Sequence, residues 1–419
     1  MSFTVRKAIG LALGIAAAAM GGLIAAPTLH DRLWIGHALF SEFPWITSFV
    51  GGAGAVTSLA RSPRSPWGAA FAAAGFGLSL LPMARARTAM EDMNKAMVMG
   101  LGKDYEQQIP PVMLERLAPH RWTLPNTLRW QYDFSNVNII HNVVYSQPGL
   151  RALKLDVYQP TTPPAVGNKY PAVISIHGGA WRSYDKGGVF VPHHSYLASQ
   201  GYVVFDIQYR FSAEAIWPAQ LQDAQCAIRW VKAHARAYNI DPTRIALIGR
   251  SSGAHMALMA AYRPNDPKVG KTCADDEDSS VSAVVAIYPP TDLRLWQSIP
   301  GGAVYELLGG QIDEIPEVYA DASPIEFVRD DLPPTLIAQG YMDELVQPVH
   351  AELLDNLLRG TNTPSVLLRV PWGRHVFDAV MSGMGAQLIQ YHIDRFLAWS
   401  LYKDMRDDEL REFPGVPYQ

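Results

Sequence analysis

From about residue 134 onward, short apolar segments alternate with segments of helical periodicity. Eight of the apolar segments have the length of a β-strand: 136–145, 152–158, 172–176, 203–207, 245–248, 283–288, 335–338 and 366–370. Most of the later ones are continuously apolar, which is typical of parallel strands buried on both faces. Residues 218–235 place Leu221, Ala224 and Ile228 on one helical face. Strands joined by helices predict an α/β fold with a mostly parallel eight-stranded sheet.

The N-terminal region has a different pattern. Residues 8–30, 43–60 and 65–84 contain no Asp, Glu, Lys or Arg and are rich in Gly and Ala. Each approaches the roughly 20 residues that cross a bilayer, and small residues let helices pack closely in lipid. We predict a membrane region over residues 1–87 with three transmembrane helices. The alternatives are a secretory signal peptide for the first segment, which its length disfavours, and core helices for the other two.

The basic residues beside these segments bear on their orientation, because cytoplasmic flanks are enriched in Lys and Arg. The basic pairs within 6–7 and 61–64 place those flanks in the cytoplasm, which leaves the α/β region outside it; the pair within 85–87 favours the reverse. Residues 88–133 are predicted to be a connector that begins with a methionine-faced helix over 88–101. That helix could dock on the membrane or on the domain, or simply connect the two. The catalytic domain is expected over 134–405, followed by a polar tail over 406–419.

Charge and cysteine content narrow the possibilities further. The formal net charge of −4 and the lack of a long basic tract give no reason to expect nucleic acid as a partner. Cys226 and Cys273 do not have the spacing of a metal site. They could form one bridge in an oxidising compartment, but we expect two unpaired, half-buried thiols, because free cysteine is among the most buried residue types.

In a doubly wound sheet, ligands bind at the carboxyl ends of the strands, so the turns after the strands are the places to look for chemistry. Residues 177–181 read His-Gly-Gly-Ala-Trp after the third strand, and residues 249–253 read Gly-Arg-Ser-Ser-Gly after the fifth. Residues 340–346 bring Asp343 after the seventh strand, and residues 372–375 end in His375 after the eighth. A nucleophile, an acid, a base and a glycine-rich turn therefore meet at one edge of the sheet.

The Gly-x-Ser-x-Gly pattern fits only when it is centred on Ser251, because Ser252 lacks glycines two positions away. A serine on a sharp strand-to-helix turn has a strained backbone, and larger neighbours two positions away would clash. Ser251 is thus the candidate nucleophile. The backbone N–H groups of Gly178, Gly179 and Ser252 are the candidate oxyanion hole.

His375 is the candidate base and Asp343 the candidate acid. Asp292, after the sixth strand, is the main rival for the acid, whereas Asp378 lies too close to His375 in sequence to orient it from the proper side. His177 is expected to hold its own turn by hydrogen bonding. Four other histidines are expected to be structural or solvated: His193, His194, His255 and His350. Because only a neutral imidazole can act as a base, we expect activity to fall below about pH 6.5, the ordinary pKa of histidine.

The motifs HGGAW, GRSSG, GYMDELV and GRHVF, in this order, resemble the esterase/lipase branch of the α/β-hydrolases. The resemblance covers residues 134–400 and is closest to hormone-sensitive-lipase-like and feruloyl-esterase-like carboxylesterases. It implies the α/β-hydrolase fold and no metal or cofactor. The chain departs from the pattern at Ala180, where a third glycine is common, and this favours short, less bulky acyl groups. Arg250, before the serine, has no explanation in the sequence. The roles that the resemblance implies are Ser251 nucleophile, His375 base, Asp343 acid, and Gly178, Gly179 and Ser252 as oxyanion hole.

We therefore expect a serine carboxylesterase or lipase that hydrolyses small-molecule or lipid esters of short- to medium-chain acids through an acyl-enzyme. An amidase or formamidase with the same triad is one alternative. A catalytically silent, membrane-bound interaction module is another, and a transporter is disfavoured because the apolar segments contain no charged residue. Residues 294–332 could form a lid or a plain connector. Candidate pocket walls, each also compatible with packing, are Trp181, Tyr209, Trp296 and Trp372.

Overall fold

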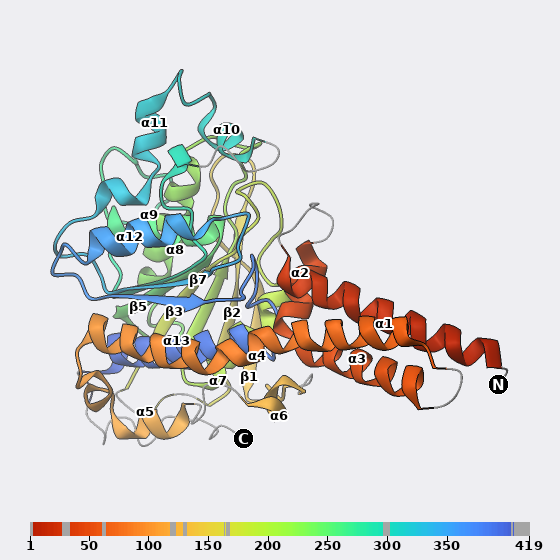
Figure 1. The fold of residues 1–419 in the computed structure, drawn as a ribbon. Helices are drawn as coiled ribbons and strands as arrows, with labels where there is room; N and C mark the ends of the chain where they lie inside the picture. Colours follow the sequence, from red (N-terminus) through yellow and green to blue (C-terminus); the bar gives the residue numbers. More distant parts are fainter. Residues whose placement is uncertain are drawn as a thin grey trace.

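A computed structural model of the protein shows an α/β domain with a helical bundle projecting from one side (Figure 1). The structure describes residues 3–26, 34–60, 64–117, 123–128, 132–162, 164, 168–295, 302–403 and 405. The predicted tail over 406–419 and Trp296 lie outside the described residues. The bundle consists of α1 (Phe3–Ala25), α2 (Trp34–Glu42), α3 (Pro44–Leu59) and the first half of α4 (Pro66–Leu101).

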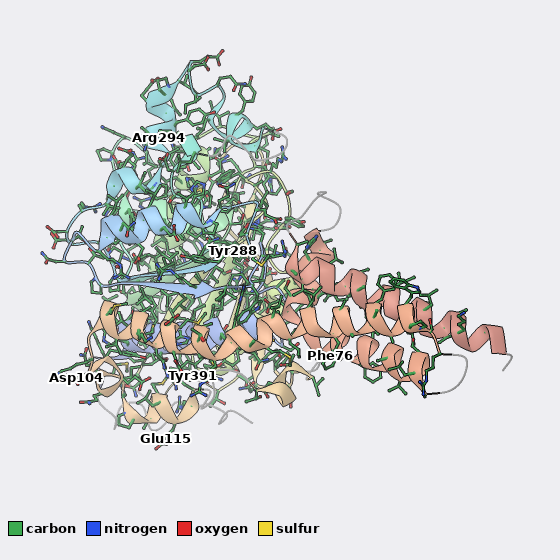
Figure 2. All side chains as sticks on the ribbon, in the orientation of Figure 1. Phe76, Asp104, Glu115, Tyr288, Arg294 and Tyr391 are labelled. Carbon is green, nitrogen blue, oxygen red and sulfur yellow. A yellow bond between two sulfur atoms is a disulfide. The ribbon has the colours of Figure 1, made fainter. Side chains whose placement is uncertain are left out.

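The bundle helices pack through small residues. At Gly75 of α4, a Cβ atom would lie 2.2 Å from the carbonyl of Ala17 in α1, so only glycine permits this approach. Large apolar side chains point outward instead, among them Phe76 (Figure 2) and Trp67, which is 72% exposed. An apolar exterior around a core of small residues is the packing that helices adopt in lipid.

Within the part of the chain that the structure describes, two helices are long and apolar enough to cross a membrane, Lys7–Ala25 and Pro66–Leu101. They correspond to the first and third predicted spans. The second predicted span forms α3, whose 16 residues extend about 24 Å. This is shorter than the hydrocarbon core of about 30 Å.

Helix α4 runs without a break through the predicted domain boundary at residue 87. The segment after residue 82 contains many strong helix formers, so the third apolar segment and the methionine-faced helix form one continuous rod. Its second half docks on the α/β domain: Met93 and Met97 are buried, and Asn94 Oδ1 lies 3.3 Å from His392 Nε2. Of the three alternatives for residues 88–101, the structure thus shows docking on the domain.

All eight predicted strands form, in the spatial order β1-β2-β4-β3-β5-β6-β7-β8. The pairs β1/β2 and β2/β4 are antiparallel and the remaining pairs are parallel. This confirms the predicted α/β-hydrolase fold class. The strands are β1 (Val137–Ser146), β2 (Leu153–Pro160), β3 (Tyr170–Ile176), β4 (Val203–Ile207), β5 (Ile240–Arg250), β6 (Ala283–Ile287), β7 (Thr335–Gly340) and β8 (Ser365–Val370).

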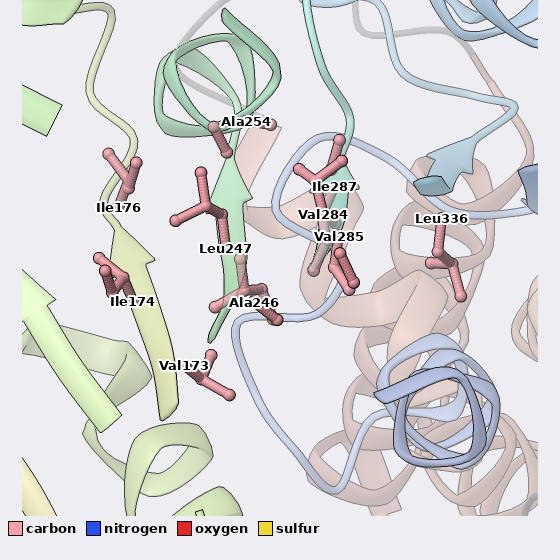
Figure 3. Close-up of a cluster of buried hydrophobic side chains, with 14 of the residues drawn as sticks. Val173, Ile174, Ile176, Ala246, Leu247, Ala254, Val284, Val285, Ile287 and Leu336 are labelled. Carbon is pink, nitrogen blue, oxygen red and sulfur yellow. The ribbon is translucent and has the colours of Figure 1, made fainter. Parts of the chain in front are cut away.

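Helices cover both faces of the sheet, with α8, α9 and α12 on one side and α7, α13 and the second half of α4 on the other (Figure 1). The central strands are therefore buried on both faces, and Figure 3 shows in this core Ile174, Leu247 and Val284, which are in register on three neighbouring strands. Each such side chain contributes about 1.5–3 kcal/mol by leaving water.

The other α-helices are α5 (Pro111–Arg116), α6 (Leu124–Thr127), α7 (Val191–Ser199), α8 (Ala219–Ala233), α9 (Ser252–Tyr262), α10 (Ala303–Leu308), α11 (Pro316–Asp321), α12 (Pro348–Leu358) and α13 (Met384–Tyr402). Short 3₁₀ helices are η2 (Tyr105–Gln108), η3 (Gly188–Phe190), η4 (Leu293–Leu295) and η5 (Pro324–Phe327).

The expectation for the two cysteines needs correction. Cys226 and Cys273 are joined in a disulfide rather than unpaired. Helix α8 carries Cys226 to within 5.7 Å (Cα–Cα) of Cys273, which lies 47 positions later in the sequence.

Candidate active site

Ser251 occupies the sharp turn between β5 and α9. Its backbone has φ 55° and ψ −123°, a strained conformation for a residue with a side chain. A Cβ atom on Gly249 would lie 2.2 Å from the carbonyl oxygen of Gly253, and one on Gly253 would lie 2.1 Å from that of Ile176. The two glycines are therefore required by close backbone contacts, as the spacing around Ser251 predicts.

The side chains of Ser251, His375 and Asp343 form a hydrogen-bonded chain. His375 Nδ1 lies 2.8 Å from Asp343 Oδ2, and His375 Nε2 lies 3.1 Å from Ser251 Oγ. The other oxygen of Asp343 accepts the backbone N–H groups of Leu345 and Val346, each at 2.9 Å. With this carboxylate fixed, the imidazole donates from Nδ1 and presents Nε2 as an acceptor to the serine hydroxyl.

The glycine-rich turn after β3 lies directly against Ser251. A Cβ atom on Gly178 would approach Arg250 O to 2.8 Å and Ser251 Cβ to 3.3 Å. Gly179 has a φ of 126°, and Ser252 begins α9, so its N–H group lies at the positive end of that helix. The structure thus places the three predicted oxyanion-hole residues, Gly178, Gly179 and Ser252, on the two turns at Ser251.

His177 holds the glycine-rich turn. Its Nδ1–H donates to the carbonyl of Gly178 at 2.7 Å, and its ring stacks on Tyr209 with centroids 4.5 Å apart. The Tyr209 hydroxyl in turn donates to the carbonyl of His177 at 3.1 Å. Burial lowers the pKa of His177, so the ring is neutral at physiological pH.

The two rival aspartates bind other partners. Both carboxylate oxygens of Asp292 accept hydrogen bonds from the Arg294 guanidinium, at 2.8 and 3.1 Å. Asp378 Oδ2 accepts from Arg250 Nε at 2.6 Å, and its Oδ1 accepts the Tyr288 hydroxyl at 2.6 Å. In the structure, the carboxylate that reaches His375 is that of Asp343.

Next to the candidate triad, Arg250 and Asp378 form a buried ion pair, and the sequence did not reveal this pair. They are separated by 128 positions, so no local pattern connects them. Although burial raises the pKa of Asp378, the Arg250 guanidinium holds it below its usual range. Tyr288, labelled in Figure 2, connects this pair to the triad, because its ring centroid lies 4.7 Å from that of His375. The pairing with Asp378 explains why an arginine stands directly before Ser251.

The four remaining histidines that the sequence singled out are buried. His194 Nε2 lies 2.9 Å from Ser175 Oγ and its Nδ1 lies 3.5 Å from Asp206 Oδ2, which repeats the order of a Ser-His-Asp triad. Each of these three residues is at most 3% exposed, so no substrate can reach them. Burial lowers the pKa to about 4 at three of the histidines, namely His193, His255 and His350.

The described candidates for pocket walls serve packing. Trp181 is fully buried and donates its Nε1–H to His255 Nδ1 at 3.3 Å. Trp372 is buried and donates to Glu42 Oε1 at 3.1 Å.

In the predicted lid segment, an ion pair of 3.1 Å between Glu306 and Arg182 ties α10 to the turn after β3. Among the described residues, no cluster of three His, Cys, Asp or Glu side chains could hold a metal ion.

Comparison with known proteins gives consistent matches. The sequence profile of the BD-FAE family matches residues 155–358. A probable carboxylic ester hydrolase of Mycobacterium tuberculosis, LipM, is 30% identical over 373 residues, which cover 87% of this chain and 86% of LipM. Esterase LipC of the same organism is 33% identical over 50% of this chain and 53% of its own length.

Two solved structures match the α/β domain. A truncated carbohydrate esterase from gut microbiota is 26% identical, with a TM-score of 0.53 over 62% of this chain and 96% of that chain. Esterase 2 of Thermogutta terrifontis is 24% identical, with a TM-score of 0.50 over 70% of this chain and 100% of its own. The latter supports the fold alone.

Proposed function

The chain belongs to the carboxylic ester hydrolases of the α/β-hydrolase superfamily, and from this premise we propose that Ser251, His375 and Asp343 are its catalytic triad. The enzyme is a serine carboxylesterase of the EC 3.1.1 type. The observation that carries the assignment of residues is the pair of distances at His375, 2.8 Å to Asp343 and 3.1 Å to Ser251.

In the proposed mechanism, His375 Nε2 takes the proton of the Ser251 hydroxyl as Ser251 Oγ attacks the ester carbonyl. Asp343 keeps the imidazole in the required tautomer and stabilises the imidazolium. The tetrahedral oxyanion binds the N–H groups at Gly178, Gly179 and Ser252, and each such donor is typically worth about 3–4 kcal/mol. The imidazolium then protonates the leaving alkoxide. Water, deprotonated by the same imidazole, releases the acid from the acyl-enzyme.

We further propose a preference for short- to medium-chain acyl groups. Ala180 stands where the related motif often has a third glycine, and it adopts a φ of 53° in the glycine-rich turn. The next residue, Trp181, is fully buried. A side chain at position 180 narrows the space at the oxyanion hole, which favours esters with little bulk at the carbonyl.

We also propose that α1 and α4 anchor the protein in a membrane with the α/β domain outside the cytoplasm. The length and composition of both helices support the anchoring. The Cys226–Cys273 disulfide supports an oxidising compartment for the domain, because cytosolic thiols are normally kept reduced.

The triad is tested with detergent-solubilised full-length protein and nitrophenyl esters of increasing acyl length. Ser251→Ala should lower kcat by a factor on the order of 10⁴ or more, and Asp343→Asn by a comparable factor, because the asparagine favours the wrong imidazole tautomer. Asp292→Asn is the matched control and should stay close to the wild-type rate. Ester turnover that survives Ser251→Ala would refute the assignment.

A further inference from the structure

The loop that carries His375 is bound to the C-terminal end of α1. Arg374, directly before His375, donates from Nη2 to the carbonyl of Ala26 at 2.6 Å and, at 3.5 Å, to that of Leu23. Its Nη1 pairs with Glu344, the neighbour of Asp343, at 3.1 Å. One buried guanidinium therefore joins the end of α1 to the neighbours of two triad residues.

The same loop is held from a second side by Glu42, the last residue of α2. Glu42 Oε1 accepts the indole N–H of Trp372 at 3.1 Å, and Oε2 accepts the backbone N–H of Gly385 at 2.5 Å. Trp372 precedes His375 by three positions and Gly385 follows it by ten, so Glu42 bridges the two ends of the loop. The side chain is 4% exposed, and burial raises its pKa to about 8.

These contacts are the kind that fixes a loop in one position. The last carbonyls of a helix have no partner within it and lie at the negative end of its dipole, where a guanidinium is favourable. A buried carboxyl group with two donors likewise defines one geometry, since leaving any of these groups unpaired is costly. The contacts lie on the N-terminal helices, outside the residues 155–358 that match the BD-FAE family.

We infer that Glu42 and Arg374 are positioning residues that hold His375 in line with Ser251 and Asp343, so that the N-terminal helices complete the active site. The inference rests on the proposed triad. Its consequence is kinetic, because a displacement of about 1 Å in a catalytic group can cost on the order of 100-fold in rate. Substrate binding should change little, because neither side chain belongs to the proposed oxyanion hole or triad.

The test uses full-length protein in detergent with Glu42→Gln, which keeps the size but only one acceptor, and with Arg374→Gln and Arg374→Lys. We expect Glu42→Gln and Arg374→Gln to lower kcat on a nitrophenyl ester by roughly 10- to 100-fold while KM stays within about twofold. Labelling of Ser251 by a fluorophosphonate should slow in parallel. Arg374→Lys, which keeps the charge, should recover part of the rate.

Glu91→Gln and Arg87→Gln are matched controls, because both residues are exposed on α4 and pair with each other. Their kcat values should equal that of the wild type. An unchanged kcat in Glu42→Gln, or a change confined to KM, would overturn the inference. If Arg374→Gln does not fold, Glu42→Gln and Arg374→Lys decide. Lack of ester hydrolysis by the wild type would instead count against the proposed triad.

Discussion

Three aspartates near the carboxyl ends of the strands differ in what their carboxylates bind. Asp343 has one oxygen occupied by two backbone N–H groups and the other directed at His375. Asp292 is paired with Arg294, and Asp378 with Arg250. The same chemical group thus has three surroundings, and only that of Asp343 leaves an acceptor for an imidazole.

A testable prediction at the scale of a single residue concerns the buried imidazole of His255. Its Nε2 donates to the carbonyl of Ala322 at 2.7 Å, and burial lowers its pKa to about 4. The ordinary value of about 6.5 applies to the unfolded chain. Between these values the unfolded chain binds more protons than the folded one, so the stability from this group is complete above pH 6.5 and is lost as the pH falls toward 4.

Between pH 6.5 and pH 4, proton uptake by His255 in the unfolded chain should lower the free energy of unfolding by about 3 kcal/mol. His255→Gln should be less stable than the wild type at pH 7.5, but its stability should decline less between pH 7 and pH 4.5. Denaturant unfolding of both proteins across this range measures the difference. Parallel pH profiles would contradict the assignment of a neutral buried imidazole.

At the scale of elements, the turn between β5 and α9 is linked to the loop after β8. The Arg250–Asp378 pair joins the residue before Ser251 to the third residue after His375. The two turns come from strands that are not neighbours in the sheet. The buried ion pair fixes the position of one turn relative to the other. Hydrophobic contacts fix such a position less well, because they are non-directional.

Asp378→Asn tests this link. It leaves the Arg250 guanidinium buried without its counter-charge, and such a loss typically costs about 3–5 kcal/mol of stability. Asp292→Asn is the control, because its partner Arg294 is partly exposed (36%) and solvent screens the pair. Thermal unfolding of the full-length variants should show a much larger shift for Asp378→Asn. Equal shifts would show that the buried pair is not a structural link.

Helix α4 has a comparable role between the two parts of the molecule. Its first half packs on α1 and α3, and its second half packs on β8 and α13. A continuous helix transmits orientation because successive turns are hydrogen-bonded to each other, and α4 remains helical through Pro82, which itself has no N–H to donate. The bundle therefore stands in a defined position relative to the sheet (Figure 1).

At the scale of the whole molecule, the disulfide constrains a long stretch of chain. Cys226 and Cys273 lie 47 positions apart and enclose a segment that contains the turn at Ser251. Closing a loop of this length should stabilise the folded protein by about 4 kcal/mol in the chain-entropy description. We expect the double variant Cys226→Ala/Cys273→Ala to lose stability of this order.

Chemical unfolding with and without a thiol reductant measures this contribution. Reductant should destabilise the wild type and leave the double variant unchanged. A wild type that loses its disulfide by thiol titration, yet unfolds at the same denaturant concentration, would contradict the prediction.

The sequence alone determined much of this protein, because the signals are local. Continuous apolar strands predicted the eight-stranded sheet, since burial on both faces leaves no polar positions. The glycines around Ser251 singled it out as the candidate nucleophile for a steric reason confined to five residues. The candidate acid and base followed from the rule that turns after parallel strands share one edge.

Only the tertiary structure decided which distant groups meet. The pairs Arg250–Asp378, Cys226–Cys273 and Glu42–Trp372 join residues separated by 47 to 330 positions, and no local pattern encodes such a contact. The same holds for the helical bundle. Its apolar segments predicted helices, but they did not predict that the bundle would contact the loop of His375. Local sequence specifies which face of each element is apolar, whereas the partner of a buried polar group is set by how those faces pack together.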